Sequence, residues 1–330
     1  MKKSFLAKLF LLTIIFFSFN LYLANQAKAL TVISPVLEIN TQAGENQRGV
    51  LKVYNETETE VNLVASVEPF KASNDETGKP EYLSPSQSAD FSYLQWFKLA
   101  QNAITLKPAQ AAKIPFVIDI PPEAKSGGYY AVVFWQNAPV PGQEKSMVNI
   151  SGRVGTIILL RVAGNLQESG EVLDFTPQPL KDYYFELPIN FVIRFSNTGN
   201  VHLAPQGEIS IKNWFGQVTK LDINPGSHNV LPDSIRRFEV SWGQKPISNN
   251  FFSNFLFELK QEFKNFPLGR CQASLDLSYG FETQQKINWE ISFWVIHWRL
   301  LVVVFLFLVI LFLLIRINSK IKRLKRLGVK

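Results

Sequence analysis

The chain has 330 residues, with 34 lysines and arginines, 27 aspartates and glutamates, a formal net charge of +7 and one cysteine. This length is enough for two domains that each bury a core. One cysteine excludes a disulfide framework and a four-thiolate zinc site, and three scattered histidines offer no histidine-built metal or catalytic centre. We therefore expect no cofactor.

The N-terminal segment has the three-part plan of a secretory signal. Three lysines in the first eight residues precede an apolar run at 9–19, and Ala27-Lys28-Ala29 is a small-x-small site. We predict a signal peptide over residues 1–29, cleaved after Ala29; the alternative is an uncleaved N-terminal anchor. No cysteine lies directly after the apolar run, where a lipoprotein anchor would be attached, so a lipoprotein anchor is excluded.

Alternation of apolar and polar residues predicts β-strands through the following 261 residues, 30–290. The clearest alternating runs are 61–67, 114–120, 189–195, 238–242 and 271–279. The runs are separated by turn residues and show little helical pattern, which is typical of antiparallel sandwiches. We predict an all-β ectodomain of two tandem immunoglobulin-like β-sandwiches, at 30–164 and 165–290. Cys271 falls on the apolar face of its strand and is expected to be an inert core thiol.

A weak internal repeat supports two related domains. Residues 49–70 and 190–211 share one plan, in which a strand ends at an asparagine turn, Asn55 or Asn197, and a second strand follows. Asn55 and Asn149 also match the glycosylation sequon, which is a frequent chance match.

One aromatic strand, GYYAVVFW at 128–135, is apolar on both faces. Tyr129 and Trp135 share one face, and Tyr130 and Phe134 share the other. We favour a central strand covered on both faces. The alternative is that one face docks a partner protein or a cell-wall glycan, which makes Tyr129, Tyr130 and Trp135 the candidate partner-binding residues.

Residues 251–266 do not fit the strand pattern, because their apolar residues recur at helical spacing. We interpret this segment as an insertion in the second domain that forms a short amphipathic helix. The helix lies on the membrane, packs on the sandwich or meets a partner, and we favour packing on the sandwich.

A long apolar run near the C-terminus predicts one transmembrane helix over 293–315, a span of about 34 Å at 1.5 Å per residue. His297 and Arg299 are expected near the outer interface, with Arg299 snorkelling towards water. An aromatic belt is expected at the same boundary. Its members are Trp289, Trp294 and Trp298.

The segment after this helix, 316–330, carries cations and no acid. The cations are Arg316, Lys320, Lys322, Arg323, Lys325, Arg326 and Lys330. The positive-inside rule predicts that this tail is cytoplasmic, and a signal peptide would put the N-terminal ectodomain outside, as in a type I single-pass protein. The tail either contacts anionic lipid headgroups or only sets the orientation. All 27 acids lie between Leu30 and Glu290 beside 22 cations, so the ectodomain has a net charge of −5. Nucleic acid is therefore not expected as a partner.

The sequence contains no motif of a known catalytic site. GxSxG, HExxH, a P-loop, GxGxxG and CxxC are all missing. His202 and His228 lie in turn-like stretches, and Asp75 and Glu76 lie in a polar loop, so we expect all four at the solvated surface. We predict that the protein is not an enzyme.

The region from Thr31 to Phe134 resembles the N-terminal domain of the WxL-interacting proteins, bacterial surface proteins whose first domain is described as peptidoglycan-binding. The matching segments are 35–66, the loop NDETGKPEY at 74–82, and 105–135. The layout of signal peptide, two sandwiches, one span and basic tail is also similar to that family. The resemblance implies a membrane-anchored cell-surface protein that binds a surface protein or peptidoglycan. The alternative function is a structural or scaffold subunit of a membrane protein complex.

Overall fold

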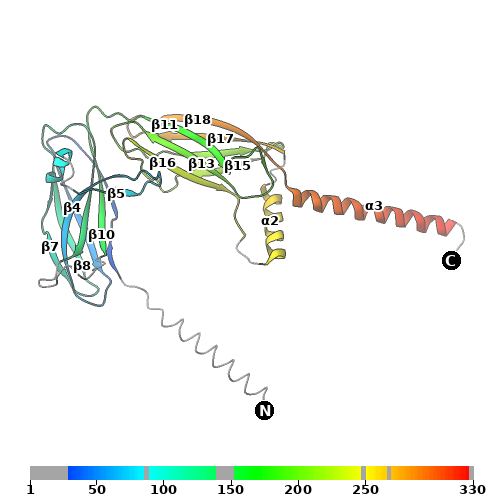
Figure 1. The fold of residues 1–330 in the computed structure, drawn as a ribbon, viewed down its shortest axis with the longest axis horizontal. Helices are drawn as coiled ribbons and strands as arrows, with labels where there is room; N and C mark the ends of the chain where they lie inside the picture. The colour runs from blue at the N-terminus through cyan, green and yellow to red at the C-terminus, as the bar shows by residue number, and fades with distance from the viewer. Residues whose placement is uncertain (1–28, 85–88, 139–151, 247–249, 266–268, 327–330) are drawn as a thin grey trace, which may run out of the picture. The chain divides into compact units, whose positions relative to one another are not determined.

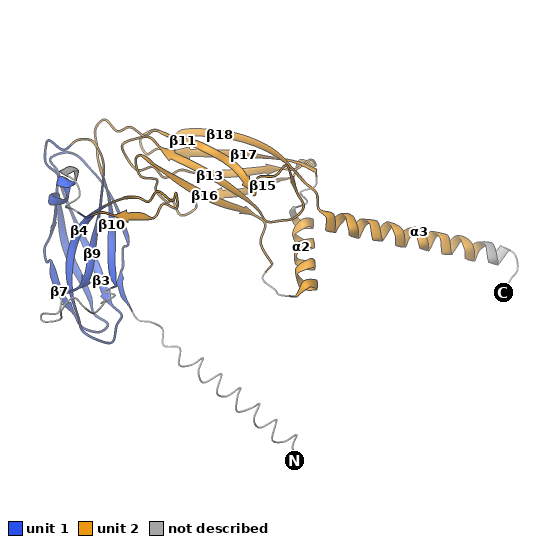
Figure 2. Cartoon of the chain, in the orientation of Figure 1, with its two compact units in different colours: residues 1–69, 84–124, 129–160 blue, residues 70–83, 125–128, 161–330 orange. Residues whose placement is uncertain are grey.

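The computed structural model describes residues 29–84, 89–138, 152–246, 250–265 and 269–326 (Figure 1). It divides into two compact units (Figure 2). Unit 1 comprises residues 1–69, 84–124 and 129–160, and unit 2 comprises residues 70–83, 125–128 and 161–330. The segments 70–83 and 125–128, which we expected in the first domain, therefore group with the second. The predicted signal peptide lies outside the described residues except for Ala29.

Unit 1 is built on two sheets. The first has the order β1 (Leu30–Val32), β3 (Asn46–Asn55), β8 (Ala111–Asp119) and β6 (Phe97–Leu99). The second has the order β2 (Val36–Thr41), β10 (Arg153–Val162), β9 (Gly127–Asn137), β4 (Val61–Ala72) and β5 (Pro80–Tyr82), and β7 (Ala103–Leu106) also pairs with β4. Within this second sheet, β5 and residues 70–72, 127–128 and 161–162 are grouped with unit 2. Ile114, Phe116 and Ile118 alternate into the core, as their spacing predicts.

Unit 2 contains the second sandwich. One sheet has the order β11 (Gly170–Gln178), β13 (Ile189–Asn197) and β16 (Ser234–Trp242). The other has the order β12 (Tyr183–Tyr184), β18 (Gln285–Val295), β17 (Gly269–Tyr279), β14 (Gln206–Lys212) and β15 (Val218–Ile223). The odd-numbered residues of β13 and β17 meet in one buried core. The predicted fold class, immunoglobulin-like β-sandwiches followed by one apolar helix, is confirmed.

Cys271 is one of these core residues, with no exposed side-chain surface. Burial raises the pKa of its thiol to about 12. The thiol is therefore protonated at neutral pH and unreactive, as the alternation predicts.

The two repeated asparagines make equivalent turns. Asn55 is fully buried, and its amide donates to the carbonyls of Thr59 and Leu106 at 2.9 and 3.1 Å. Asn197 is also fully buried, and its amide donates to the carbonyls of Val201 and Val230, both at 2.8 Å. Asn55 therefore has a structural role that leaves its amide no access to a modifying enzyme; Asn149 lies outside the described residues.

Two helices complete unit 2: α2 (Phe251–Asn265) and α3 (Trp298–Arg326). The predicted helix at 251–266 is thus present. The expected start of the long helix at Phe293 is wrong, because Phe293 and Val295 belong to β18 and are 3% and 0% exposed in the sandwich core. The apolar residues at the end of β18 directly precede the apolar helix, so hydropathy alone predicted a single helix over both segments. Within α3, Trp298–Lys322 is long and apolar enough to cross a membrane.

Candidate functional site

The aromatic strand proposed from the sequence is β9, which lies between β10 and β4 in its sheet. The interpretation as a central strand is therefore correct. Trp135 is 0% exposed, so its indole is part of the core and is not available to a partner. Tyr129 and Tyr130 are half-buried and keep part of their side chains at the surface.

Tyr129 belongs to an aromatic cluster that the sequence did not reveal. The other members, Phe91, Tyr93 and Trp96, come from the short 3₁₀ segment η2 (Ala89–Trp96). The ring centroid of Tyr129 lies 4.7 Å from that of Trp96 and 5.2 Å from that of Tyr93. Phe91 adds an edge-on contact with Tyr93 at 6.3 Å. Such spacings are those of favourable aromatic pairs.

One hydrogen bond fixes η2 on β9. The Tyr93 hydroxyl donates to the Tyr130 carbonyl at 2.7 Å. Burial raises the pKa of Tyr93 to about 12 and raises that of Tyr129 as well. Both phenols are therefore neutral at physiological pH. Tyr93 is buried, whereas Phe91, Trp96 and Tyr129 are half-buried, so the cluster presents aromatic surface on a fixed base.

The opposite face of β9 is covered within unit 1. The Arg153 guanidinium lies 3.8 Å from the centroid of Phe134 and makes two contacts with the Glu68 carboxylate, at 3.0 and 2.9 Å. Phe134 is 4% exposed beneath it. Tyr130 shares this face, so the structure does not bring Tyr129, Tyr130 and Trp135 together in one surface.

A cluster of charged residues lies where α3 leaves the sandwich. Arg299 is 7% exposed and forms ion pairs with Glu258 at 2.6 Å and with Glu262 and Glu186 at 3.2 Å each. Carboxylates of α2 thus compensate the buried charge of Arg299. Its expected place near the outer membrane interface stays a prediction. The Leu300 amide donates to Glu262 at 3.2 Å, which joins the first turn of α3 to α2.

His297 is 1% exposed in the same junction. Burial, together with the Arg299 charge, lowers its pKa to about 4, so the imidazole is neutral at physiological pH. Burial raises the pKa of Glu262, and its contacts with Arg299 oppose that shift. The junction is thus a buried charge network around one arginine.

The residues of the expected aromatic belt occupy different places. Trp294 stacks on Tyr183, with ring centroids 6.4 Å apart, and Trp298 lies under the Arg299 guanidinium at 4.9 Å. Trp289 pairs with Leu275 further along β18, five residues or about 17 Å from Trp294. All three are partly exposed. Their contact with a membrane interface stays a prediction.

The basic residues of the tail lie on or beyond the last turns of α3. Arg316, Lys320 and Lys322 are exposed. The side chains of Arg323, Lys325 and Arg326, and the whole of Lys330, lie outside the part that the structure describes.

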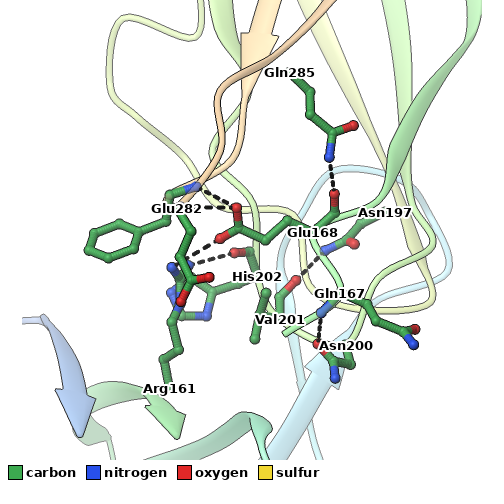
Figure 3. Close-up of polar contacts among 10 residues, drawn as sticks. Arg161, Gln167, Glu168, Asn197, Asn200, Val201, His202, Glu282 and Gln285 are labelled. Carbon is green, nitrogen blue, oxygen red and sulfur yellow. Dashed lines mark hydrogen bonds and ion pairs between the residues drawn. The ribbon is translucent and has the colours of Figure 1, made fainter. Parts of the chain in front are cut away.

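At the other end of unit 2, His202, which was expected at the surface, is buried beside an ion pair (Figure 3). His202 is 4% exposed, and its carbonyl accepts a hydrogen bond from Arg161 at 3.1 Å. Arg161 forms a buried ion pair with Glu168 at 3.3 Å. Burial, with the Arg161 charge, lowers the His202 pKa to about 4. A turn-like sequence could not show that unit 2 covers this histidine; His228 is exposed, as expected.

The polar loop also departs from its expectation. The Glu76 carboxylate accepts two hydrogen bonds from Arg194 on β13, one of them from Nε at 2.8 Å. The Glu76 carbonyl accepts from the Arg237 amide on β16 at 2.8 Å. Arg194 lowers the pKa of Glu76. Glu76 is therefore a structural contact of unit 2 and not simply a solvated charge.

Among the described residues, no group of three or more histidine, cysteine, aspartate or glutamate side chains could hold a metal ion.

No family model and no curated protein matches the chain. Solved structures with a similar arrangement include the class 5 fimbriae chaperone CfaA, at 12% identity over 79% of this chain and 98% of that chain, with a TM-score of 0.37. The CupB2 chaperone of Pseudomonas aeruginosa matches at 12% identity over 80% of this chain and 100% of that chain, with a TM-score of 0.34. A complex of the Salmonella enterica SafA pilin with the SafB chaperone matches at 11% identity over 81% and 99%, with a TM-score of 0.34. These values carry no argument about function, and the resemblance to the WxL-interacting proteins stays a prediction.

Proposed function

We propose that this protein is a non-enzymatic, single-pass protein of a bacterial cell membrane whose sandwiches lie outside the cell. α3 crosses the membrane, and the basic segment 316–330 is cytoplasmic. Two observations support this proposal. α3 is long and apolar enough to cross a membrane. Seven cations follow it, whereas the region before it, from Leu30 to Glu290, has a net charge of −5.

The ectodomain binds a cell-envelope partner, either a surface protein or peptidoglycan, through the aromatic cluster of unit 1. The observation that carries this proposal is the pair Trp96 and Tyr129, whose rings lie 4.7 Å apart and are half-buried. Tyrosine and tryptophan are enriched where binding energy is concentrated, because they supply large contact areas with little loss of conformational freedom. The cluster is already ordered by Tyr93, so binding needs little rearrangement.

The test is retention of the full chain, in detergent, on isolated cell-wall sacculi and on an immobilised extract of surface proteins. The double variant Trp96→Ala/Tyr129→Ala is compared with wild type. Trp214→Ala, which removes an exposed indole from unit 2, is the matched control. We expect the double variant to bind one of the two supports at least about tenfold more weakly, a loss typical of a small hot spot.

The control variant should bind as wild type does. Retention of the double variant at the wild-type level would contradict the assignment of the cluster. Failure of the wild-type chain to bind either support would contradict the proposed function itself.

A further inference from the structure

The helix α2 leaves several of its apolar residues exposed. Phe252, Leu256 and Phe263 follow one another at helical spacing, and their side chains are 67%, 49% and 59% exposed. We name these three residues the α2 stripe. The expectation that the apolar side packs on the sandwich holds only in part, because Phe255 and Leu259 are half-buried whereas the α2 stripe is exposed.

Polar residues of α2 face the rest of unit 2 instead. Glu258 and Glu262 turn inward to Arg299, and the Gln261 side chain exchanges hydrogen bonds of 2.7 and 2.6 Å with the backbone of Gln244. The two lysines of α2, Lys260 and Lys264, are exposed. The exposed surface of the helix therefore combines apolar residues with positive charge.

Further exposed aromatic side chains occur at the same end of unit 2. Trp214 and Phe215, 68% and 63% exposed, form the tip of the β14–β15 turn. This turn adjoins α2, since the Gln217 side chain donates from Nε2 to the Lys264 carbonyl at 3.4 Å. Tyr183, 51% exposed, stacks on Trp294 at the end of β18. The register of the sheet puts all of these near Val295, three residues before α3 begins.

We propose that this end of unit 2 rests in the headgroup region of the membrane that α3 crosses, with the α2 stripe inserted among the lipids. Figure 1 shows α2 running crosswise to α3 where α3 leaves the sandwich. If α3 stands along the membrane normal, α2 lies in the membrane plane, as interfacial amphipathic helices do. The occupant of the stripe is lipid, because the ion pairs of Arg299 fix α2 to the first turn of the span itself.

The charges agree with this occupant. Lys260 and Lys264 are exposed, whereas the two carboxylates of α2 are turned to Arg299, so the exposed surface of α2 carries positive charge and little negative charge. Tryptophan and tyrosine are the side chains that collect at the headgroup level. This inference rests on the membrane anchoring in the proposed function.

The test measures depth with the full chain in nanodiscs of phosphatidylcholine and phosphatidylglycerol. A spin label is attached to Phe252→Cys, and its accessibility to oxygen is compared with its accessibility to a water-soluble nickel chelate. Phe281→Cys is the matched control, because Phe281 is also 67% exposed but lies at the β17–β18 turn, far along both strands from α3. Leu308→Cys in α3 reports on the span. Cys271 is buried and stays unlabelled.

We expect label 252 to be more accessible to oxygen than to nickel, label 281 to show the reverse, and label 308 to be the deepest. If label 252 were more accessible to nickel than to oxygen while label 308 showed the reverse, this inference would be overturned but the proposed anchoring would stand. A label 252 shielded from both reagents would also overturn it, since a protein surface would then cover the stripe. A water-like label 308 would overturn the anchoring of the proposed function, and the inference with it.

Discussion

Single buried polar residues fix the turns of both sandwiches. Asn197 donates two hydrogen bonds from its amide, and its side-chain oxygen accepts one from the Gly199 amide at 2.9 Å. Each contact gives a hydrogen-bond partner to a backbone group that would otherwise be buried without one. Asn55 makes the same kind of turn in unit 1.

Replacing Asn197 with alanine should therefore destabilise unit 2 by about 3 kcal/mol, because several buried backbone groups lose their partners at once. Asn62→Ala is the control: Asn62 is exposed and makes one side-chain contact, with Thr105, so its loss should stay within about 0.5 kcal/mol. Denaturant or thermal unfolding of both variants measures the difference. Equal stability of the two variants would contradict the role given to Asn197.

The buried histidine His202 should make stability depend on pH. Its pKa is about 4 in the folded chain and about 6.5 when unfolded, so the unfolded state binds more protons between these values. Its contribution to stability is complete above pH 6.5 and falls as the pH drops towards 4, by at most about 1.4 kcal/mol per pH unit.

Unfolding free energies at pH 7 and pH 5 test this expectation. His202→Gln should reduce the difference between the two pH values, and His228→Gln, at an exposed position, should not. His297, whose pKa is also lowered to about 4, contributes equally in both variants. A pH dependence in His202→Gln equal to that of wild type would refute the assignment.

The sequence pattern predicted which residues are buried where apolar and polar residues alternate regularly. It failed where contacts between distant parts of the chain determine burial. The alternating faces of β13 and β17, and the burial of Cys271, follow from period-2 spacing alone. Glu76 and His202 were expected at the surface because their sequence neighbours are polar, but Arg194 and Arg161 reach them from distant strands. Likewise, the alternation along β9 could not show that Trp135 is fully buried while Tyr129, on the same face, stays partly exposed.

At the scale of elements, the buried arginine at the junction decides how α2 is placed. Arg299→Ala would leave Glu258 and Glu262 facing a low-dielectric site without a cation. Breaking a buried charge network in this way typically costs about 3 kcal/mol or more. We expect α2 to detach from α3 while the sandwich core stays folded.

Amide hydrogen exchange of the full chain in nanodiscs measures this detachment. The amides of residues 251–265 should lose protection in Arg299→Ala, while those of β13 and β17 should not. Arg316→Ala, at an exposed position on α3, is the control. Unchanged protection of α2 in Arg299→Ala would show that the ion pairs do not fix it.

The spacing of apolar residues predicted α2 as a helix but not which side of it faces the protein. The inward side is set by Glu258 and Glu262, whose partner Arg299 was assigned to a lipid interface from hydropathy. For the same reason, hydropathy placed the expected start of α3 at Phe293, which belongs to β18. Hydropathy detects apolar segments but does not distinguish a core strand from the helix that follows it.

For the whole molecule, the net charge of +7 is the sum of segments with different surroundings. The region from Leu30 to Glu290 carries −5, whereas the segment after residue 315 carries seven cations and no acid. The charge therefore supports an orientation across a membrane and not a nucleic-acid partner. We propose separate roles for the aromatic cluster of unit 1, in binding a partner, and for the α2 stripe of unit 2, in contact with lipid.

Protease treatment of intact cells that express the full chain with a C-terminal epitope tests this orientation most directly. We expect the protein to stay in the membrane fraction after alkaline carbonate washing. External protease should remove the sandwiches and leave a short tagged fragment that contains α3 and residues 316–330. A full-length tagged chain after protease treatment, in cells whose other surface proteins are digested, would contradict the orientation, and release by carbonate would contradict the anchoring.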